Sequence, residues 1–261
     1  MFFRLIKYMG YIMFSRHGRG HGIHSPFVFD LVSRVMRNKT DRDIVLKIES
    51  IRKRNLSDGR VISIQDPGAG SSKMKDNLRR VSDIVKYTAV PAKYGRLLFN
   101  MAGEFGKPGI VELGTSLGIS TLYLSAACPD SMVYTVEGCS ATAEIATENF
   151  KSYGTSNITL IQESFDTAIN DLIAKSLKPG LVFIDGHHSK EPTLRYFELM
   201  AGHCDKGTVI IIDDIHSSGE MEEAWSMIKE HKEVTATIDI FRMGLVFFRE
   251  GISSFDYVIR Y

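Results

Sequence analysis

The stretch Glu112-Leu113-Gly114-Thr115-Ser116-Leu117-Gly118-Ile119-Ser120-Thr121 decides the fold of this chain. It follows a short apolar run that starts at Gly109, and a helical pattern begins near Gly118. Glycine at 114 and 118 permits a tight turn and lets the backbone approach a ligand closely. The amides that open the helix can meet a carboxylate. The pattern therefore predicts a strand, a glycine loop and a helix, in that order.

The same alternation continues toward the C-terminus. Five strand-like runs cover residues 109–114, 132–137, 158–162, 181–185 and 208–213. The helical patterns between and after them cover residues 118–127, 141–153, 166–176, 190–203 and 220–231. This alternation is typical of a doubly wound, mostly parallel α/β sheet. The last two runs, 234–241 and 245–249, are separated by a short turn, which predicts an antiparallel hairpin. We therefore expect a Rossmann-like sheet of about seven strands that ends in this hairpin.

Composition narrows the class of protein. The chain has 261 residues, a formal charge of +1, 44% apolar residues and three cysteines without a CxxC pair. These values exclude a disordered or collagenous chain, and they argue against a disulfide framework. Free cysteines are typical of a reducing compartment, so we expect a cytoplasmic protein.

The near-zero charge conceals an asymmetry. Residues 1–104 contain 20 Lys/Arg and 9 Asp/Glu, whereas residues 105–261 contain 12 and 22. We interpret residues 1–104 as a basic, mainly helical N-terminal cap on the substrate side, and residues 105–261 as an acidic core. The simplest use of the basic cap is to pack on that core. Contacts with nucleic acid, membrane lipid or an acidic substrate are the alternatives.

Three N-terminal features require separate interpretation. Phe2, Leu5, Ile6, Met9 and Met13 fall on one helical face, which predicts an amphipathic docking helix over residues 1–14. It is too short to span a bilayer, but it suits a membrane surface or, as the commoner use, the protein body or a second subunit. The Gly/His-rich residues 17–25 are interpreted as a lid or substrate-side loop, and the Gly-rich residues 61–72 as a flexible connector.

A candidate ligand contact follows the second strand. Glu137 lies 23 residues past Gly114, where a carboxylate can bind the ribose hydroxyls of an adenosine. The dinucleotide fingerprint GxGxxG would need glycine at 116 and 119, but Ser116 and Ile119 stand there. The spacing thus favours an adenosine ligand other than a dinucleotide.

These residues resemble the class I S-adenosylmethionine-dependent methyltransferases. The likeness covers residues 109–250 and rests on Glu112-x-Gly114-x-x-x-Gly118, on Glu137 and on the terminal hairpin. Ser116 departs from the usual central glycine, as the O-methyltransferase branch often tolerates. The resemblance implies S-adenosylmethionine as cofactor. The cofactor-binding residues that it implies are Glu112, Gly114, Thr115, Ser116, Gly118, Glu137, Ser164 and Asp185.

Two further strand ends resemble the cation-dependent O-methyltransferases. Asp185 follows the fourth strand, and Asp213-Asp214 follow the fifth, with Asp214 where that branch has Asn. The resemblance implies that Asp185, Asp213 and Asp214 hold Mg²⁺, which would lower the pKa of a substrate hydroxyl. The alternative is a general base without metal, taken from His187, His188 and His216. Together with Asp185, these histidines are the catalytic candidates.

The leading hypothesis is a methyltransferase that transfers a methyl group from S-adenosylmethionine to the oxygen of a small hydroxylated or sugar-like molecule, with or without a divalent metal. Nucleic acid is not an expected partner, whereas a homodimer and a peripheral membrane contact through residues 1–14 stay open. An NAD-dependent oxidoreductase is the enzymatic alternative. A non-catalytic binding module with a basic arm for membrane or nucleic acid is the other.

Overall fold

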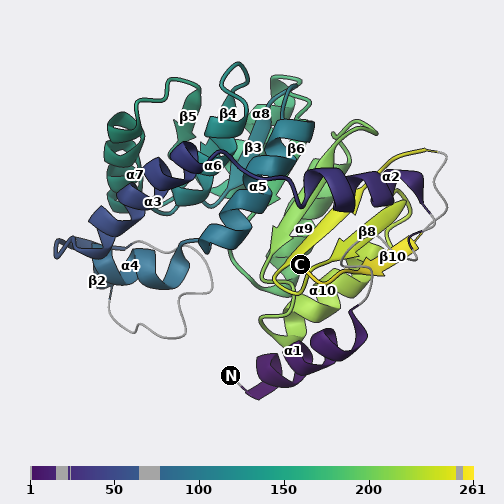
Figure 1. Ribbon diagram of the computed structural model, residues 1–261. Helices are drawn as coiled ribbons and strands as arrows, with labels where there is room; N and C mark the ends of the chain where they lie inside the picture. The colour runs from purple at the N-terminus through teal and green to yellow at the C-terminus, as the bar shows by residue number, and fades with distance from the viewer. Residues whose placement is uncertain (1, 16–22, 24, 65–76, 251–254) are drawn as a thin grey trace. The chain divides into compact units, whose positions relative to one another are not determined.

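The computed structural model describes residues 2–15, 23, 25–64, 77–250 and 255–261 (Figure 1). Contacts divide the chain into two compact units. Unit 1 comprises Met1–Asn38 and Lys178–Tyr261, and unit 2 comprises Lys39–Leu177. The predicted boundary at residue 104, between a cap and a core, concerns function and stays a prediction.

The strands of unit 1 run in the order β10-β8-β9-β7-β6. They are β6 (Leu181–Ile184), β7 (Val209–Asp213), β8 (Ala236–Asp239), β9 (Met243–Phe247) and β10 (Phe255–Val258). β6 and β7 are parallel, and β9 is antiparallel to both β7 and β8. The predicted terminal hairpin is therefore confirmed. The helices α9 (Lys190–Ala201) and α10 (Gly219–Lys229) follow β6 and β7, as the alternation predicts.

One strand of unit 1 was not predicted. β10 pairs in parallel with β8, so the described strands β3–β10 number eight rather than seven. The segment is only four residues long, and three of its side chains are exposed. It therefore lacks the buried apolar run by which the other strands were recognised. This addition leaves the α/β, mostly parallel class unchanged.

The N-terminal part of unit 1 contains α1 (Phe2–Phe14), α2 (Pro26–Asp30) and the π-helical turn η1 (Leu31–Val35). The predicted helix over residues 1–14 is confirmed, but the face expected to pack against the protein body is the exposed one. Leu5, Ile6, Met9 and Met13 are all exposed. No helix in the described part of the chain is both long and apolar enough to cross a membrane. Most of the Gly/His-rich stretch 17–25 lies outside the described residues, so its predicted role as a lid stays a prediction.

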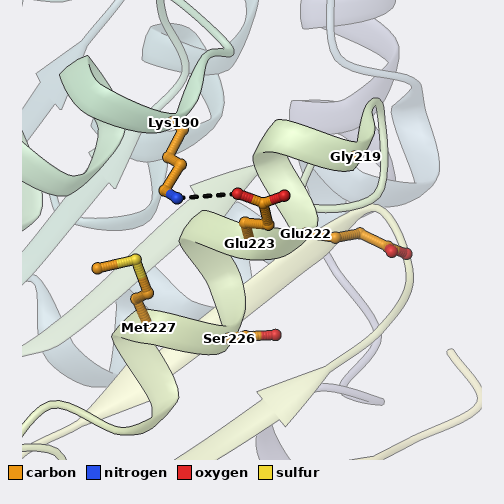
Figure 2. A pocket seen from close by; sticks show the side chains of 6 residues that line it. All are labelled: Lys190, Gly219, Glu222, Glu223, Ser226 and Met227. Carbon is orange, nitrogen blue, oxygen red and sulfur yellow. Dashed lines mark hydrogen bonds and ion pairs between the residues drawn. The ribbon is translucent and has the colours of Figure 1, made fainter.

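A shallow hollow of about 470 Å³ lies beside α9 and α10 in unit 1 (Figure 2). Its wall is formed by Lys190, Gly219, Glu222, Glu223, Ser226 and Met227. Lys190 Nζ lies 2.8 Å from Glu223 Oε2, so these two wall charges are paired with each other. None of the residues predicted for cofactor or catalysis lines this hollow, and we assign it no ligand.

Unit 2 contains a parallel three-stranded arrangement in the order β3-β4-β5. The strands are β3 (Ile110–Leu113), β4 (Val133–Val136) and β5 (Ile158–Ile161), and the helices that follow them are α6 (Ile119–Ala127), α7 (Ser140–Tyr153) and α8 (Phe165–Ala174). All four residues of β3 are buried, as expected for a strand covered on both faces. The predicted alternation holds throughout this unit.

The remaining elements of unit 2 precede the sheet. They are α3 (Arg42–Leu56), β1 (Val61–Ser63), β2 (Leu78–Arg80), α4 (Val81–Thr88) and α5 (Ala92–Phe105). Residues 61–63, interpreted from the sequence as part of a connector, instead form a strand that pairs antiparallel with β2. Residues 65–76 of that connector lie outside the described part. α5 packs on α6 at Gly95, where a Cβ atom would lie 2.4 Å from the Tyr123 ring.

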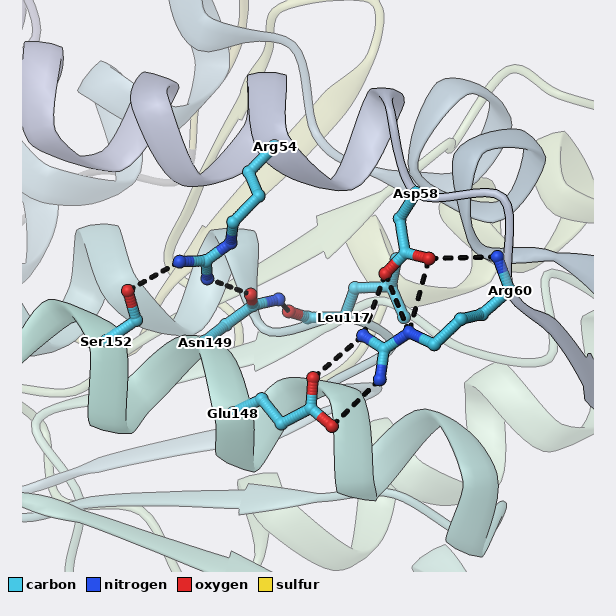
Figure 3. A network of polar contacts seen from close by, with 7 residues as sticks. All are labelled: Arg54, Asp58, Arg60, Leu117, Glu148, Asn149 and Ser152. Carbon is cyan, nitrogen blue, oxygen red and sulfur yellow. Dashed lines mark hydrogen bonds and ion pairs between the residues drawn. The ribbon is translucent and has the colours of Figure 1, made fainter.

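Basic residues of α3 and the following loop bind polar groups of α7 (Figure 3). Arg60 Nη2 lies 2.8 Å from Glu148 Oε2 and also contacts Asp58. Arg54 donates to Asn149 Oδ1 at 2.9 Å, and the Asn149 amide donates in turn to the carbonyl of Leu117 at 2.9 Å. Within unit 2, basic residues that precede the sheet are thus linked to α7 and, through Asn149, to the loop after β3.

Candidate active site

The loop after β3 has a backbone that requires glycine at two positions. Gly114 and Gly118 adopt φ values of 109° and 79°, in the region that residues with a side chain rarely occupy. A Cβ atom at Gly118 would also lie 2.4 Å from Cε1 of Phe150. Ser116 shares this conformation, with φ 48°, although it carries a side chain. The motif quoted from the sequence is therefore a strained loop, and such strain clusters at functional sites.

Glu137 connects the end of β4 to this loop. Its Oε2 accepts a hydrogen bond of 2.8 Å from the Ser116 amide, and its Oε1 accepts one of 2.9 Å from the Cys139 amide. The side chain is half-buried. The structure thus brings together two of the residues predicted for the cofactor, Glu137 and Ser116.

Glu112 and Thr115 have a different position, because both are buried. The hydroxyls of Thr121 and Thr135 donate to Glu112 Oε2, and Thr115 lies 2.6 Å from the Thr135 hydroxyl. Burial raises the pKa of Glu112 to about 7. These contacts place Glu112 and Thr115 beneath the loop, where they hold β3, β4 and α6 together and do not line its surface.

Ser164 lies between β5 and α8, directly before the helix. Its hydroxyl accepts a hydrogen bond of 3.2 Å from the Thr167 amide and so caps α8. A capping hydroxyl is a sufficient structural reason for serine here. Its predicted contact with the cofactor stays a prediction.

The strand ends of unit 1 are dominated by a buried ion pair. Arg242, in the turn between β8 and β9, donates to both carboxylate oxygens of Asp213, at 3.0 Å and 2.6 Å. Asp213 is buried at the end of β7. Burial alone would lower the pKa of Arg242, but Asp213 raises it above its usual range, so the guanidinium stays charged.

The three carboxylates predicted for Mg²⁺ therefore do not fit a metal centre. Asp213 is occupied by Arg242, and Asp214 pairs at 3.0 Å with Arg4 of α1. Asp185 lies 3.4 Å from the Nε2 atom of His188. Across the described residues, no group of three or more His, Cys, Asp or Glu is placed to hold a metal ion. The positive charge that pairs with Asp213 is the guanidinium of Arg242.

His216 is held between two carboxylates. Its Nε2 lies 2.7 Å from Asp239 Oδ2, and its Nδ1 lies 2.9 Å from Glu222 Oε1. Burial alone would lower the pKa of His216, but these two neighbours raise it above its ordinary value. Both nitrogens of the imidazole are therefore engaged, which suits a positioned cation better than a free general base.

His187 and His188 lie in the strained turn after β6. Their φ values are 62° and 35°. Asp214, after β7, and Phe241, after β8, also have positive φ values. Among the described residues, six that are not glycine adopt a positive φ, and all but Ser176 follow the ends of β3, β6, β7 or β8. His188 is exposed, whereas His187 contacts the Tyr196 ring edge-on. Of the three predicted bases, His188 is thus the accessible one.

Sequence reasoning missed the partners of these side chains. Arg242 lies in the predicted hairpin turn and Arg4 in the predicted N-terminal helix, but no partner was predicted for either residue. Arg4 lies 210 residues from Asp214 in the chain, and no local pattern signals such a pairing. The position of Arg242 could have predicted its pairing with Asp213, because a basic residue in a hairpin turn lies beside the end of the neighbouring strand.

Residues 111–215 match a family model described as a methyltransferase domain. A catechol O-methyltransferase of Mycobacterium tuberculosis is 30% identical over 133 residues, which is 50% of this chain and 59% of that protein. The chain therefore spans less than two thirds of this relative.

Solved structures share the fold. The cofactor-bound protein Rv0187 from MTB is 19% identical with a TM-score of 0.58, over 86% of this chain and 95% of that one. An O-methyltransferase from Bacillus cereus, in complex with SAH, is 17% identical with a TM-score of 0.57, over 85% and 97%. These likenesses show that the chain shares the fold of these two proteins.

Proposed function

We propose that this protein transfers a methyl group from S-adenosylmethionine to a hydroxyl oxygen of a small hydroxylated or sugar-like molecule. The observation that carries the proposal is Glu137, whose carboxylate accepts amide hydrogen bonds from the loop after β3 and from Cys139 at the start of α7. This is the strand end where a carboxylate recognises ribose. It lies inside the region that matches a methyltransferase domain.

The residues around this loop suit S-adenosylmethionine. Glu137 would bind the ribose hydroxyls, while Gly114, Ser116 and Gly118 would let the backbone approach the cofactor. When bound, the cofactor supplies a sulfonium-activated methyl group, so the protein's task is chiefly to align the acceptor and take its proton. Glu112 and Thr115 would act indirectly, by supporting the loop from beneath.

His188 is our proposed general base. The Nε2 atom faces Asp185 at 3.4 Å, which favours the tautomer with its proton on Nε2. Nδ1 is then the atom with a lone pair, and it would take the proton that the acceptor hydroxyl releases as the oxygen attacks the methyl carbon. Asp185 would orient the ring, in the manner of the carboxylate in a catalytic triad.

We propose that this proton transfer proceeds without a metal ion. The support comes from the donor set, since both oxygens of Asp213 already bind Arg242 and Asp214 pairs with Arg4. A divalent ion would have to displace a bidentate arginine from a buried carboxylate. That exchange is costly because it leaves the guanidinium unpaired.

Transfer of a labelled methyl group tests the proposal. Because the matched relative of Mycobacterium tuberculosis is named for catechol, catechol and simple sugars serve as the first acceptors. We expect S-adenosylhomocysteine and an O-methyl ether to form in equal amounts with at least one hydroxylated acceptor. The Glu137→Ala variant should lose this activity, and Glu144→Ala, which removes an exposed carboxylate from α7, should keep it. Transfer that proceeds equally well in Glu137→Ala would contradict the proposal.

A further inference from the structure

The helix α1 turns its polar and aromatic side toward the rest of unit 1. Arg4 pairs with Asp214 at 3.0 Å, and Lys7 pairs with Glu222 at 2.8 Å. The Tyr11 hydroxyl donates to the carbonyl of Ile259 at 2.6 Å, and the Tyr8 and Tyr11 rings pack on Phe241. Positions 4, 7, 8 and 11 are three and four residues apart, so they share one helical face. That face anchors α1 to its unit.

The opposite face of α1 is apolar and exposed. Leu5, Ile6, Met9 and Met13 are 56%, 52%, 57% and 70% exposed. An ordinary surface helix buries its apolar stripe and turns its charges to solvent. Here the arrangement is reversed, because ion pairs and tyrosines hold the inner side. A cluster of exposed large apolar side chains on one face indicates a surface that contacts another apolar body.

The chemistry of this face favours lipid over protein. Its four side chains are aliphatic or thioether and include no Tyr, Trp or Arg, the residues that supply most of the binding energy in specific protein interfaces. The charge pattern agrees with this assignment. Arg4 and Lys7 are paired with Asp214 and Glu222, but residues 12–29 add Arg16 and Arg19 and no Asp or Glu, so this part of the chain would be attracted to anionic headgroups.

The length of α1 determines how it would bind. Thirteen residues extend about 20 Å at 1.5 Å per residue, against the roughly 30 Å of a bilayer core. A helix of this length with one apolar face lies in the plane of the interface, with that face among the acyl chains. Arg4 and Lys7 lie on the opposite face, so their ion pairs with Asp214 and Glu222 could persist while the helix is bound.

We propose that the outward face of α1, formed by Leu5, Ile6, Met9 and Met13, is a membrane-binding surface that inserts peripherally into an anionic bilayer. The ion pairs and tyrosine contacts on its inner face hold the helix in position to do so. This inference does not depend on the proposed methyl transfer, because binding is measured without cofactor or acceptor.

Co-sedimentation with vesicles tests the inference on the full chain. Vesicles of phosphatidylcholine with phosphatidylglycerol are compared with phosphatidylcholine alone. The Leu5→Ser/Met9→Ser variant removes apolar surface without changing charge. Leu46→Ser/Leu56→Ser is the matched control, because these leucines of α3 are 55% and 45% exposed on a helix of unit 2. Circular dichroism establishes that each variant is folded, as exposed substitutions should be.

The wild-type protein and the α3 control should sediment with the mixed vesicles, and less with phosphatidylcholine alone. The α1 variant should bind the mixed vesicles about tenfold more weakly, since two apolar contacts with the acyl region are lost. Equal sedimentation of the α1 variant and the wild type, or no sedimentation of the wild type, would overturn the proposal. A wild-type dimer by light scattering that the α1 variant dissociates, without vesicle binding, would overturn it in favour of a second copy of the chain.

Discussion

The strand ends of unit 2 and those of unit 1 use their polar side chains in opposite ways. In unit 2, Glu137 accepts hydrogen bonds from the backbone amides of Ser116 and Cys139. In unit 1, Asp213 binds Arg242, and His216 lies between Asp239 and Glu222. One region therefore presents acceptors held by the backbone, whereas the other pairs its charges with one another.

This difference separates the two resemblances found in the sequence. Glu137 and the loop after β3 lie together, as the cofactor resemblance implies, whereas the carboxylates predicted for Mg²⁺ pair with basic side chains. A glycine loop and a strand-end acid are close in the chain, and their geometry follows from the strand-loop-helix order. A metal site also depends on what else approaches its carboxylates. In unit 1, arginines from other segments of the chain pair with two of these carboxylates, Arg242 with Asp213 and Arg4 with Asp214.

The buried pair of Asp213 and Arg242 should give the largest effect on stability. Arg242→Met leaves Asp213 buried without its partner, so we expect a loss of about 3–5 kcal/mol in the free energy of unfolding. Urea titration measures it. Lys178→Met is the matched control, since the pair of Lys178 and Asp205 is 61% exposed on both sides and should cost less than about 1 kcal/mol. Equal losses of unfolding free energy in the two variants would contradict the assignment of Asp213 and Arg242 as a buried ion pair.

The second prediction concerns the pH dependence of stability, which we expect to arise from Glu112. Its pKa of about 7 lies above the ordinary 4.5, so the native state binds the proton more strongly than the unfolded state does. Stability should then fall as pH rises from 4.5 through about 7. Glu112→Gln stays neutral and can still accept both threonine hydroxyls, so above pH 7 it should be more stable than wild type by up to about 3 kcal/mol.

Unfolding in urea across this pH range measures the difference. Glu144→Gln, an exposed position on α7, supplies the control and should follow the wild-type curve. A difference between wild type and Glu112→Gln that does not change with pH would contradict the assignment of a protonated, buried Glu112.

His188 tests whether the strand ends of unit 1 carry out proton transfer. In His188→Asn we expect kcat to fall about 100-fold, the lower end of what general-base catalysis contributes. Affinity for S-adenosylmethionine should be unchanged. His203→Asn, in the exposed turn that follows α9, should retain wild-type kcat. A drop in both variants, or in neither, would remove His188 from the mechanism.

The smallest expected effect is that of a chelator. Because Arg242 and Arg4 occupy Asp213 and Asp214, treatment with EDTA should leave the rate of methyl transfer unchanged. The initial rate before and after dialysis against EDTA measures this. Loss of activity that Mg²⁺ restores would mean that the ion pairs give way to a metal, and the comparison between the two units would then fail.

Much of the fold was predictable because its signals are local. Buried strands such as β3 are largely apolar runs, and Gly114 and Gly118 predict the loop between β3 and α6. β10 escaped prediction because a short, exposed edge strand has no such run. In the site, Glu137 was identified by its distance from Gly114. The roles of Arg4 and Arg242 depend on long-range pairing, which spacing within one segment does not encode. The outward face of α1 was identified as apolar, but its orientation was set by Tyr8, Tyr11 and the two ion pairs.

The central claim is that Glu137 and the loop after β3 bind S-adenosylmethionine. Isothermal titration of the full chain with this cofactor tests it most directly, with wild type, Glu137→Ala and the Glu144→Ala control. We expect wild type and the control to bind with equal affinity. Glu137→Ala should bind at least about tenfold more weakly, as the loss of hydrogen bonds to a charged group implies. Absence of binding by the wild type, or undiminished binding by Glu137→Ala, would contradict the account.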